Sequence, residues 1–299
     1  MIRVRVPASS ANLGPGFDAV GVALRLYNTL ELEEAEAPAI EVRGEGEGTL
    51  PRAPSHLAYR AALAVVERAG RRARRPRAFR LVQHNRIPLA RGLGSSAAAI
   101  LGGAVAANAL LGRPLDAQAL LDLASEIEGH PDNAAPALLG GLVACARTPD
   151  GVRWTRIAAP PLAVVLAVPD LAVSTEEARR LLPSQVPFAD AVFNVTRTAL
   201  LVAALAAGRT DVLDEATRDR LHQPYRARLI PGLEQVFDAA RRAGAHGVAL
   251  SGSGPSVLAF GDAPGIGDAM AAAFRAAGYG CRTLAVQIDT DGAVVESAT

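Results

Sequence analysis

The sequence predicts an α+β protein in which two halves each pack helices against a sheet. Segments with strand periodicity alternate with segments of helical periodicity, but without the regular spacing of repeated βαβ units. The chain has 299 residues, which is enough for two domains of ordinary size. A proline pair, Pro160-Pro161, separates two groups of segments, so we expect domains at residues 1–158 and 159–299.

The expected elements follow from periodicity and from the residues that begin each helix. Alternating or β-branched apolar runs predict strands at residues 2–6, 19–33, 40–43, 78–83, 142–146, 152–157, 162–168, 247–250, 257–260 and 281–288. Apolar residues at helical spacing predict helices at residues 55–70, 93–111, 116–128, 174–182, 190–207, 233–243 and 264–277. Ser55, Asp116 and Ser174 are the expected N-caps, and Ser174 opens a Ser-Thr-Glu-Glu capping box.

Composition excludes several classes of function. The net charge of +1 gives no general attraction for nucleic acid or an anionic membrane. Two cysteines, Cys145 and Cys281, fit a reducing compartment better than a disulfide framework. Residues 1–6 lack the apolar core of a signal peptide, and no uninterrupted apolar run reaches membrane-spanning length. We therefore expect a cytoplasmic protein with no membrane partner.

The arginine-rich run at residues 71–77 has two interpretations. It could bind RNA, but no aromatic residue interleaves it and Pro76 interrupts it. We interpret it as a solvated loop and keep RNA binding as the alternative.

The stretch at residues 88–99 predicts an anion site. Gly92 and Gly94 permit a tight turn, and Ser95 or Ser96 is the expected N-cap of the helix that follows. Unpaired N–H groups and the positive end of the helix dipole attract anions at such a helix start. The chain has no lysine, so it contains no Walker loop. An ordinary helix cap is the alternative interpretation.

Two further Gly/Ser-rich loops, at residues 12–18 and 251–256, accompany this stretch. Carboxylates occur at Asp18, Glu126 and Asp132, and arginines at Arg197 and Arg226. Phosphoryl transfer needs groups that bind phosphate, oxygen ligands for Mg²⁺ and a positioned acceptor. The combination therefore favours a phosphate-plus-metal site.

The three loops resemble the three motifs of the GHMP small-molecule kinases. They read PASSANLGPGFD at residues 7–18, PLARGLGSSAA at residues 88–98 and GSGPS at residues 252–256. EIEGHPDN at residues 126–133 and QPYR at residues 223–226 resemble the branch that phosphorylates L-homoserine. The resemblance covers nearly the whole chain and implies a ribosomal S5 domain 2-like N-terminal domain and a ferredoxin-like C-terminal domain. The implied reaction is ATP-dependent phosphorylation of the homoserine side-chain hydroxyl in threonine biosynthesis.

The resemblance also implies a role for each matching residue. ATP would be bound by Pro88, Arg91, Gly92, Leu93, Gly94, Ser95, Ser96, Ala97 and Ala98. Ser96 and Glu126 would hold Mg²⁺, which prefers oxygen ligands. Homoserine would be bound by Asn12, Asp18, His130, Asp132, Arg197, Arg226 and Gly252, with the two arginines at its carboxylate. The expected catalytic set is Glu126, Ser96, Asp132 and Asn133.

Several alternatives stay open. Glu126 could lie on a solvated helix surface, as we expect for Glu128, and His130 could be a core histidine. Where the family often has Asn-Leu beside adenine, this chain has His56-Leu57. Another acceptor within the superfamily and a catalytically silent binding protein are the competing functions. A homodimer is one option for the assembly.

Overall fold

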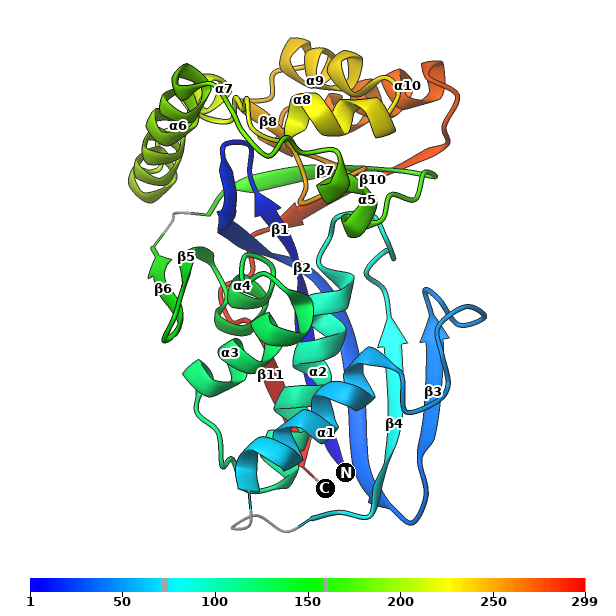
Figure 1. The fold of residues 1–299 in the computed structure, drawn as a ribbon. Coiled ribbons are helices and arrows are strands. Elements are labelled where there is room, and N and C mark those ends of the chain that lie inside the picture. The colour runs from blue at the N-terminus through cyan, green and yellow to red at the C-terminus, as the bar shows by residue number, and fades with distance from the viewer. Residues whose placement is uncertain (71–74, 159–160, 299) are drawn as a thin grey trace.

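The computed structural model describes residues 1–70, 75–158 and 161–298 and is shown in Figure 1. The strands are β1 (Ile2–Asn12), β2 (Gly16–Ala35), β3 (Ala39–Gly44), β4 (Ala78–Asn85), β5 (Leu142–Thr148), β6 (Gly151–Ile157), β7 (Ala163–Pro169), β8 (Gly247–Leu250), β9 (Val257–Phe260), β10 (Cys281–Gln287) and β11 (Val294–Ala298). The helices are α1 (Leu57–Ala69), α2 (Ser95–Leu110), α3 (Ala117–Glu128), α4 (Ala134–Leu139), α5 (Thr175–Arg180), α6 (Phe188–Ala207), α7 (Leu213–Ala216), α8 (Gln223–Arg226), α9 (Leu233–Arg242) and α10 (Ile266–Ala276), with a 3-10 helix η2 (Ala227–Leu229). The protein is therefore of the predicted α+β class.

The strands form two sheets. The first has the order β11-β1-β2-β4-β3, with β5 paired to β2 and β6 paired to β5. The second has the order β10-β7-β9-β8. The pair β3–β4 is parallel, whereas β1–β2 and β7–β9 are antiparallel. The chain passes from the first sheet to the second between Ile157 and Ala163.

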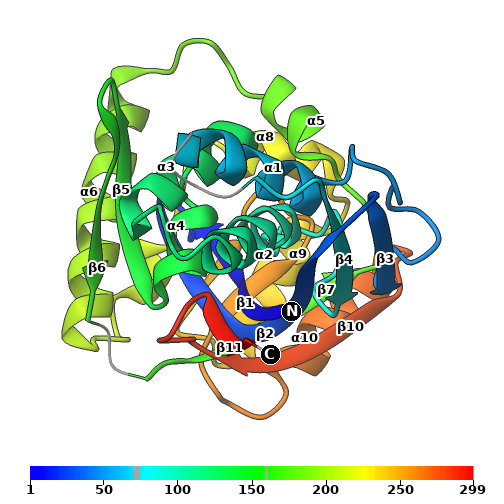
Figure 2. The ribbon, with the colours of Figure 1, turned by 90° about the horizontal axis from the view of Figure 1, so that it is seen from below.

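Helix α2 is the centre of the first layer of helices. Its residues are apolar on all sides, and Ile100, Leu101 and Val105 are buried. Such a helix needs neighbours around it. Figure 2 shows α2 enclosed by α1, α3 and α4 on one side and by the first sheet on the other. Its N-terminus is thereby fixed at the end of this layer that faces the second sheet (Figure 1).

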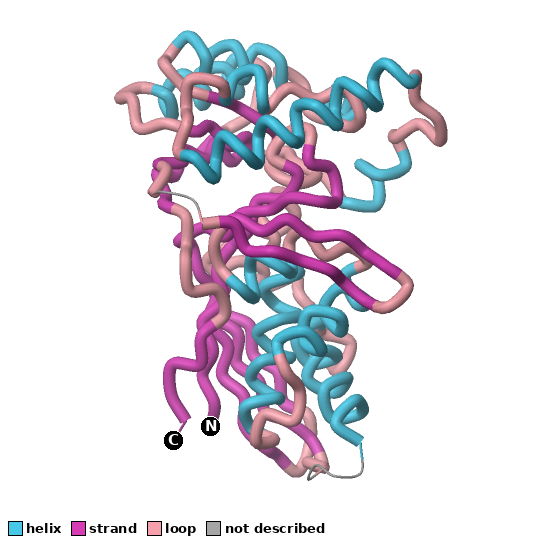
Figure 3. Tube along the Cα trace, turned by 90° about the vertical axis from the view of Figure 1, so that its left-hand side faces the viewer, coloured by secondary structure: helices cyan, strands magenta, loops and turns pink. Residues whose placement is uncertain are grey.

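Helices α9 and α10 cover the second sheet, as Figure 1 shows. They bury Phe237 and Phe274 in a second hydrophobic cluster with Val248 and Val257 of the sheet. The last strand, β11, leaves this layer and pairs with β1, where Ile2 lies opposite Ala298. Figure 3 shows the two chain ends side by side. The sequence did not predict β11, so the expected second unit, residues 159–299, does not belong to one sheet throughout.

Two predicted helix caps are confirmed and two are wrong. The Asp116 side chain accepts a hydrogen bond from the Ala119 N–H at 2.8 Å, and Ser174 Oγ accepts one from the Glu177 N–H at 3.1 Å. The N-cap of α1 is His56 rather than Ser55, without a side-chain cap. The N-cap of α2 is Gly94, in the left-handed conformation with φ 67°, rather than Ser95 or Ser96. The backbone turn places both serines inside the helix, so their hydroxyl groups are available to the surroundings.

Helix α6 is the one helix in the described part of the chain that is long and apolar enough to cross a membrane. Its polar side chains, however, bind the rest of the protein. Asn194 donates to the Pro15 carbonyl at 3.2 Å, and Arg197 pairs with Glu215 of α7. The helix therefore packs on the protein through Asn194 together with the buried Leu201 and Leu205, and it exposes other apolar side chains such as Phe188.

Two polar segments, at residues 71–77 and 222–228, differ in how they compare with the sequence. Residues 71–74 of the arginine-rich run lie outside the described residues, and Arg77 pairs at the surface with Glu36 at 2.9 Å. Periodicity predicts no helix at residues 222–228, yet this polar segment contains α8 and most of η2. This helical turn places Arg226 beneath the glycine-rich loop at residues 251–256.

Candidate active site

A cleft of about 430 Å³ lies where the three glycine-rich loops meet. The α2 N-terminus lies between its two ends. One end is lined by apolar residues that include Leu50, Leu57 and Leu89. The other end holds charged and polar side chains: Asn12, Asp18, His130, Asp132, Arg179, Arg226 and Gly252. The sequence therefore predicted most of the side chains of the polar end.

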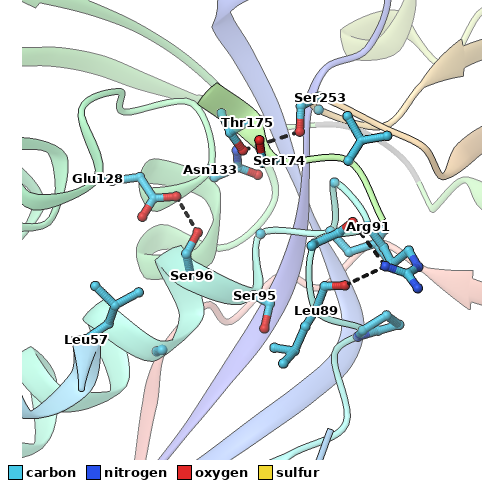
Figure 4. Close-up of a pocket in the computed structure, with 18 of the residues that line it drawn as sticks. Leu57, Leu89, Arg91, Ser95, Ser96, Glu128, Asn133, Ser174, Thr175 and Ser253 are labelled. Carbon is cyan, nitrogen blue, oxygen red and sulfur yellow. Dashed lines mark hydrogen bonds between the residues drawn. The ribbon is translucent and has the colours of Figure 1, made fainter. Parts of the chain in front are cut away.

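Backbone rather than side chains forms the middle of the cleft. Gly92 and Gly94 both have positive φ, at 71° and 67°. A Cβ on Gly92 would lie 2.1 Å from the Ser251 carbonyl oxygen, so this contact excludes any side chain. Figure 4 shows Leu57 and Leu89 on opposite sides of Ser95. The free N–H groups of the first turn of α2 can bind an anion here.

The other predicted ATP residues surround this turn in different ways. Pro88 and Leu93 line the cleft, and the Arg91 guanidinium is held by the carbonyls of Pro169 and Leu89 at 2.9 and 3.1 Å. Ala97 and Ala98 are buried in α2, so they offer backbone only.

The side-chain oxygens of Ser96 and Glu128, which both line the cleft, lie next to each other. Ser96 Oγ donates to Glu128 Oε1 at 2.5 Å, and Figure 4 shows the two side chains facing each other. Burial raises the pKa of Glu128; the hydrogen bond from Ser96 and the charge of His130 oppose this shift, and the charge of Asp132 adds to it. A hydroxyl and a carboxylate at this distance are suitable ligands for Mg²⁺. No group of three or more His, Cys, Asp or Glu side chains that could hold a metal exists among the described residues, so substrate phosphates and water would complete the shell.

The predicted metal ligand Glu126 is wrong. Its carboxylate pairs with Arg68 at 2.6 Å on the protein surface, and its side chain is 58% exposed. Glu126 and Glu128 lie in the last turn of α3. Side chains two positions apart in a helix point in directions about 200° apart around its axis. Only one of them can face the cleft, and it is Glu128 rather than the predicted Glu126.

His130, Asp132 and Asn133 follow directly after α3. His130 Nδ1 lies 2.8 Å from Asp132 Oδ1, and Asp132 is 2% exposed. Burial alone would lower the pKa of His130, but the hydrogen bond and the charge of Asp132, with the charge of Glu128, outweigh burial and raise it. Asn133 Oδ1 accepts a hydrogen bond from Ser9 Oγ at 2.9 Å, which joins this segment to β1.

The predicted arginine Arg197 lies outside the cleft, where it pairs with Glu215. The arginine that lines the cleft beside Arg226 is Arg179 of α5, which was not predicted from the sequence. Arg179 makes two hydrogen bonds to the Asp18 carboxylate, at 2.6 and 3.0 Å. The capping box at Ser174 predicted a helix here, but nothing in it distinguished Arg179 from its neighbour Arg180.

Arg226 is a buried cation at the polar end of the cleft, with 2% of its surface exposed. Its Nη1 donates to the Gly252 carbonyl at 2.9 Å and lies 3.1 Å from His222 Nδ1, while Asn12 Nδ2 donates to the same carbonyl at 3.0 Å. Its Nε has no hydrogen-bond partner in the described chain. Burial and the nearby Arg179 lower the pKa of Arg226 to about 10. A buried cation with an unpaired donor is chemically suited to bind an anion.

Comparisons with known proteins show which family the chain is similar to. The chain matches the models of the GHMP kinases N terminal domain over residues 56–141 and GHMP kinases C terminal over residues 201–280. It is 52% identical over 295 residues to a homoserine kinase of Moorella thermoacetica, covering 98% of this chain and 99% of that protein. It is 50% identical over 260 residues to a homoserine kinase of Carboxydothermus hydrogenoformans, covering 87% of this chain and 84% of that protein. The crystal structure of homoserine kinase from Cytophaga hutchinsonii matches with a TM-score of 0.87 and 32% identity, covering 98% of this chain and 96% of the other.

Proposed function

The chain belongs to the homoserine kinase family of the GHMP kinases, and we propose that its cleft transfers the γ-phosphoryl group of ATP to the side-chain hydroxyl of L-homoserine. One observation carries the proposal: Arg226, a buried cation with an unpaired Nε, lies in the same cleft as the anion-binding start of α2. A site with two separate anion-binding groups suits a phosphate donor and an acceptor that carries its own negative charge.

ATP occupies the middle and the apolar end of the cleft. Its phosphates bind the N–H groups of the first turn of α2, and Gly92 and Gly94 let the backbone approach them closely. Its base lies between apolar side chains such as Leu57 and Leu89, on either side of Ser95 (Figure 4).

Ser96 and Glu128 are the protein ligands that would hold Mg²⁺. The ion neutralises negative charge on the phosphoryl group as it is transferred. The raised pKa of Glu128 means that a proton competes with the metal for this carboxylate. We expect Mg²⁺ affinity to fall as the pH is lowered.

Homoserine occupies the polar end as a zwitterion. Its carboxylate binds Arg226 and Arg179, because a planar guanidinium matches a carboxylate well. Its ammonium group binds Asp18 and Asp132, with Asn12 nearby. These contacts direct the hydroxyl toward the start of α2, where the phosphates bind.

Orientation rather than proton abstraction is the main contribution of the acceptor end. Phosphoryl transfer through a loose transition state needs little help from a base. Asp132 is well placed to accept the hydroxyl proton or to fix the hydroxyl direction, and the hydrogen bond with His130 holds its carboxylate. We assign Asp132 the orienting role. ATP as donor and an amino acid as acceptor favour a cytoplasmic site for this step of threonine biosynthesis.

An acceptor screen tests the function. The protein is incubated with ATP, Mg²⁺ and one acceptor at a time: L-homoserine, homoserine amide or mevalonate. We expect ADP release with homoserine and little with the other two. Release with mevalonate alone would favour another GHMP activity. No release with any acceptor, despite ATP binding measured by calorimetry, would favour a catalytically silent binding protein.

A further inference from the structure

The guanidinium of Arg226 is held without an acidic partner. A buried arginine normally pairs with a carboxylate, because an isolated charge in the interior is costly. Arg226 instead bonds the Gly252 carbonyl and His222 Nδ1, and no carboxylate lies within 4.0 Å of it in the described part of the chain. The ring of Phe17 covers it at 5.3 Å from the centroid. The carboxylates whose charges act on it lie more than 4.0 Å away: Asp18, Asp219 and Asp132. No ion pair within the described chain therefore neutralises it.

The hydrogen bonds of His222 fix its protonation. His222 is fully buried, and its Nε2 lies 2.7 Å from the Gly14 carbonyl oxygen. A carbonyl oxygen only accepts, so Nε2 carries the hydrogen. Arg226 Nη1 only donates, so Nδ1 of the same ring must be the acceptor and carries no hydrogen. Burial lowers the pKa of His222, in agreement with a neutral ring.

Among the described residues, Asp219 is the carboxylate that lies within 4.0 Å of this ring, and its hydrogen bonds go to groups other than Arg226. Its oxygens accept hydrogen bonds from the N–H groups of Leu221, His222 and Gln223, and from Asn194 Nδ2 at 2.7 Å. Asp219 Oδ2 lies 3.6 Å from His222 Nε2, on the side of the ring away from Arg226. Asp219 therefore holds the backbone at the start of α8 in place. Arg226 contacts the ring of His222 only through the unprotonated Nδ1.

We propose that His222 is a positioning residue that holds Arg226 through a neutral acceptor, so that the guanidinium is oriented but keeps its charge for the carboxylate of the acceptor substrate. A carboxylate at position 222 would orient the guanidinium equally well but would neutralise it. An apolar side chain would leave the charge but lose the orientation. This role rests on the proposed function, because it assigns the substrate carboxylate to Arg226.

Three variants separate orientation from charge. His222→Asn keeps a neutral oxygen that can accept from Arg226, His222→Asp differs from it only by its negative charge, and His222→Leu has no acceptor. KM and kcat are measured for homoserine and for homoserine amide, which lacks the carboxylate, together with KM for ATP. Thermal unfolding of each variant reports its stability.

We expect His222→Asp to raise the KM for homoserine by about 10- to 100-fold above that of His222→Asn, the size of one hydrogen bond to a charged group. The KM for homoserine of His222→Leu should also be higher than that of His222→Asn. KM for the amide and for ATP should differ little among the three variants, and kcat should change less than KM. If the Asp variant does not fold, the Asn and Leu pair still decides whether the acceptor matters.

Equal KM values for homoserine in all folded variants would overturn the role of His222. A rise that is the same for homoserine and its amide, or that appears equally in KM for ATP, would show a structural residue only. Neither result affects the proposed function, which depends on whether the unaltered protein phosphorylates homoserine at all.

Discussion

The two halves of the cleft are built in different ways. The phosphate half is one continuous segment of backbone, the turn from Gly92 to Ser95 and the helix behind it. The acceptor half is made of side chains from distant elements: Asp18 of β2, Arg179 of α5 and Arg226 of α8. A continuous segment keeps its geometry by local sequence, whereas distant side chains meet only if every connecting element is placed correctly. The phosphate half should therefore tolerate change in its side chains, and the acceptor half should not.

Glu128 gives the largest expected effect because, with Ser96, it is the proposed protein ligand of Mg²⁺ beside the start of α2. Glu128→Gln keeps the size of the side chain but removes the charge that attracts Mg²⁺. We expect kcat to fall by about 10²–10³, as for the loss of one transition-state contact. Glu126→Gln is the matched control: it lies two residues away on the same helix, on the surface, and should change kcat little. Similar losses of kcat in both variants would contradict the assignment of Glu128 as the Mg²⁺ ligand.

The arginines test the acceptor half. Arg226→Ala should lower kcat/KM for homoserine by about 10², because it removes the buried cation that we propose pairs with the substrate carboxylate. Arg179→Ala should lower it by about tenfold, since Arg179 is partly exposed. Arg197→Ala, which breaks only the pair with Glu215, should have little effect. With homoserine amide, the losses at Arg226 and Arg179 should shrink. Equal losses for acid and amide would place the carboxylate site elsewhere.

The same contrast explains what the sequence predicted. The glycine loop, the helix behind it and the caps at Asp116 and Ser174 depend on local residue types, and these predictions are confirmed except for the caps near Ser55 and Ser95. The choice of Glu126 over Glu128 depended on the direction of one helix face, which periodicity near a helix end does not fix. The choice of Arg197 over Arg179 depended on where α6 packs, and that is decided by contacts with Pro15, which is far away in the sequence, and with Glu215 of the following helix, α7. Strand β11 was missed for the same reason, because its partner is the first strand.

Gly92 tests whether the phosphate half depends on backbone. Gly92→Ala would place a methyl group 2.1 Å from the Ser251 carbonyl, so the loop must move. We expect a rise of about tenfold in KM for ATP, about 1.4 kcal/mol of lost binding. Gly112→Ala is the control, because Gly112 has a similar φ of 80° but no described atom within 4 Å of the added carbon. Both variants should lose stability from the strained backbone; only Gly92→Ala should lose ATP affinity.

The smallest expected effect concerns His130 and the pH. The pKa of His130 is raised in the folded protein, where the hydrogen bond and charge of Asp132 outweigh burial. A raised pKa means that the folded state binds the proton more tightly than the unfolded chain does. The pair therefore stabilises the fold fully below the ordinary histidine value of 6.5, and this contribution is lost as the pH rises through the raised value. Tm of the unaltered protein and of His130→Gln is measured by thermal unfolding at about pH 5.5 and about pH 8.5. The gap between the two proteins should be larger at the lower pH. In an Asp132→Asn background the gap should no longer widen at the lower pH, because the partner charge is gone and burial, which lowers the pKa of His130, is then opposed only by the charge of Glu128. A gap that stays constant with pH in both backgrounds would mean that His130 contributes packing alone and that Asp132 is held by other contacts.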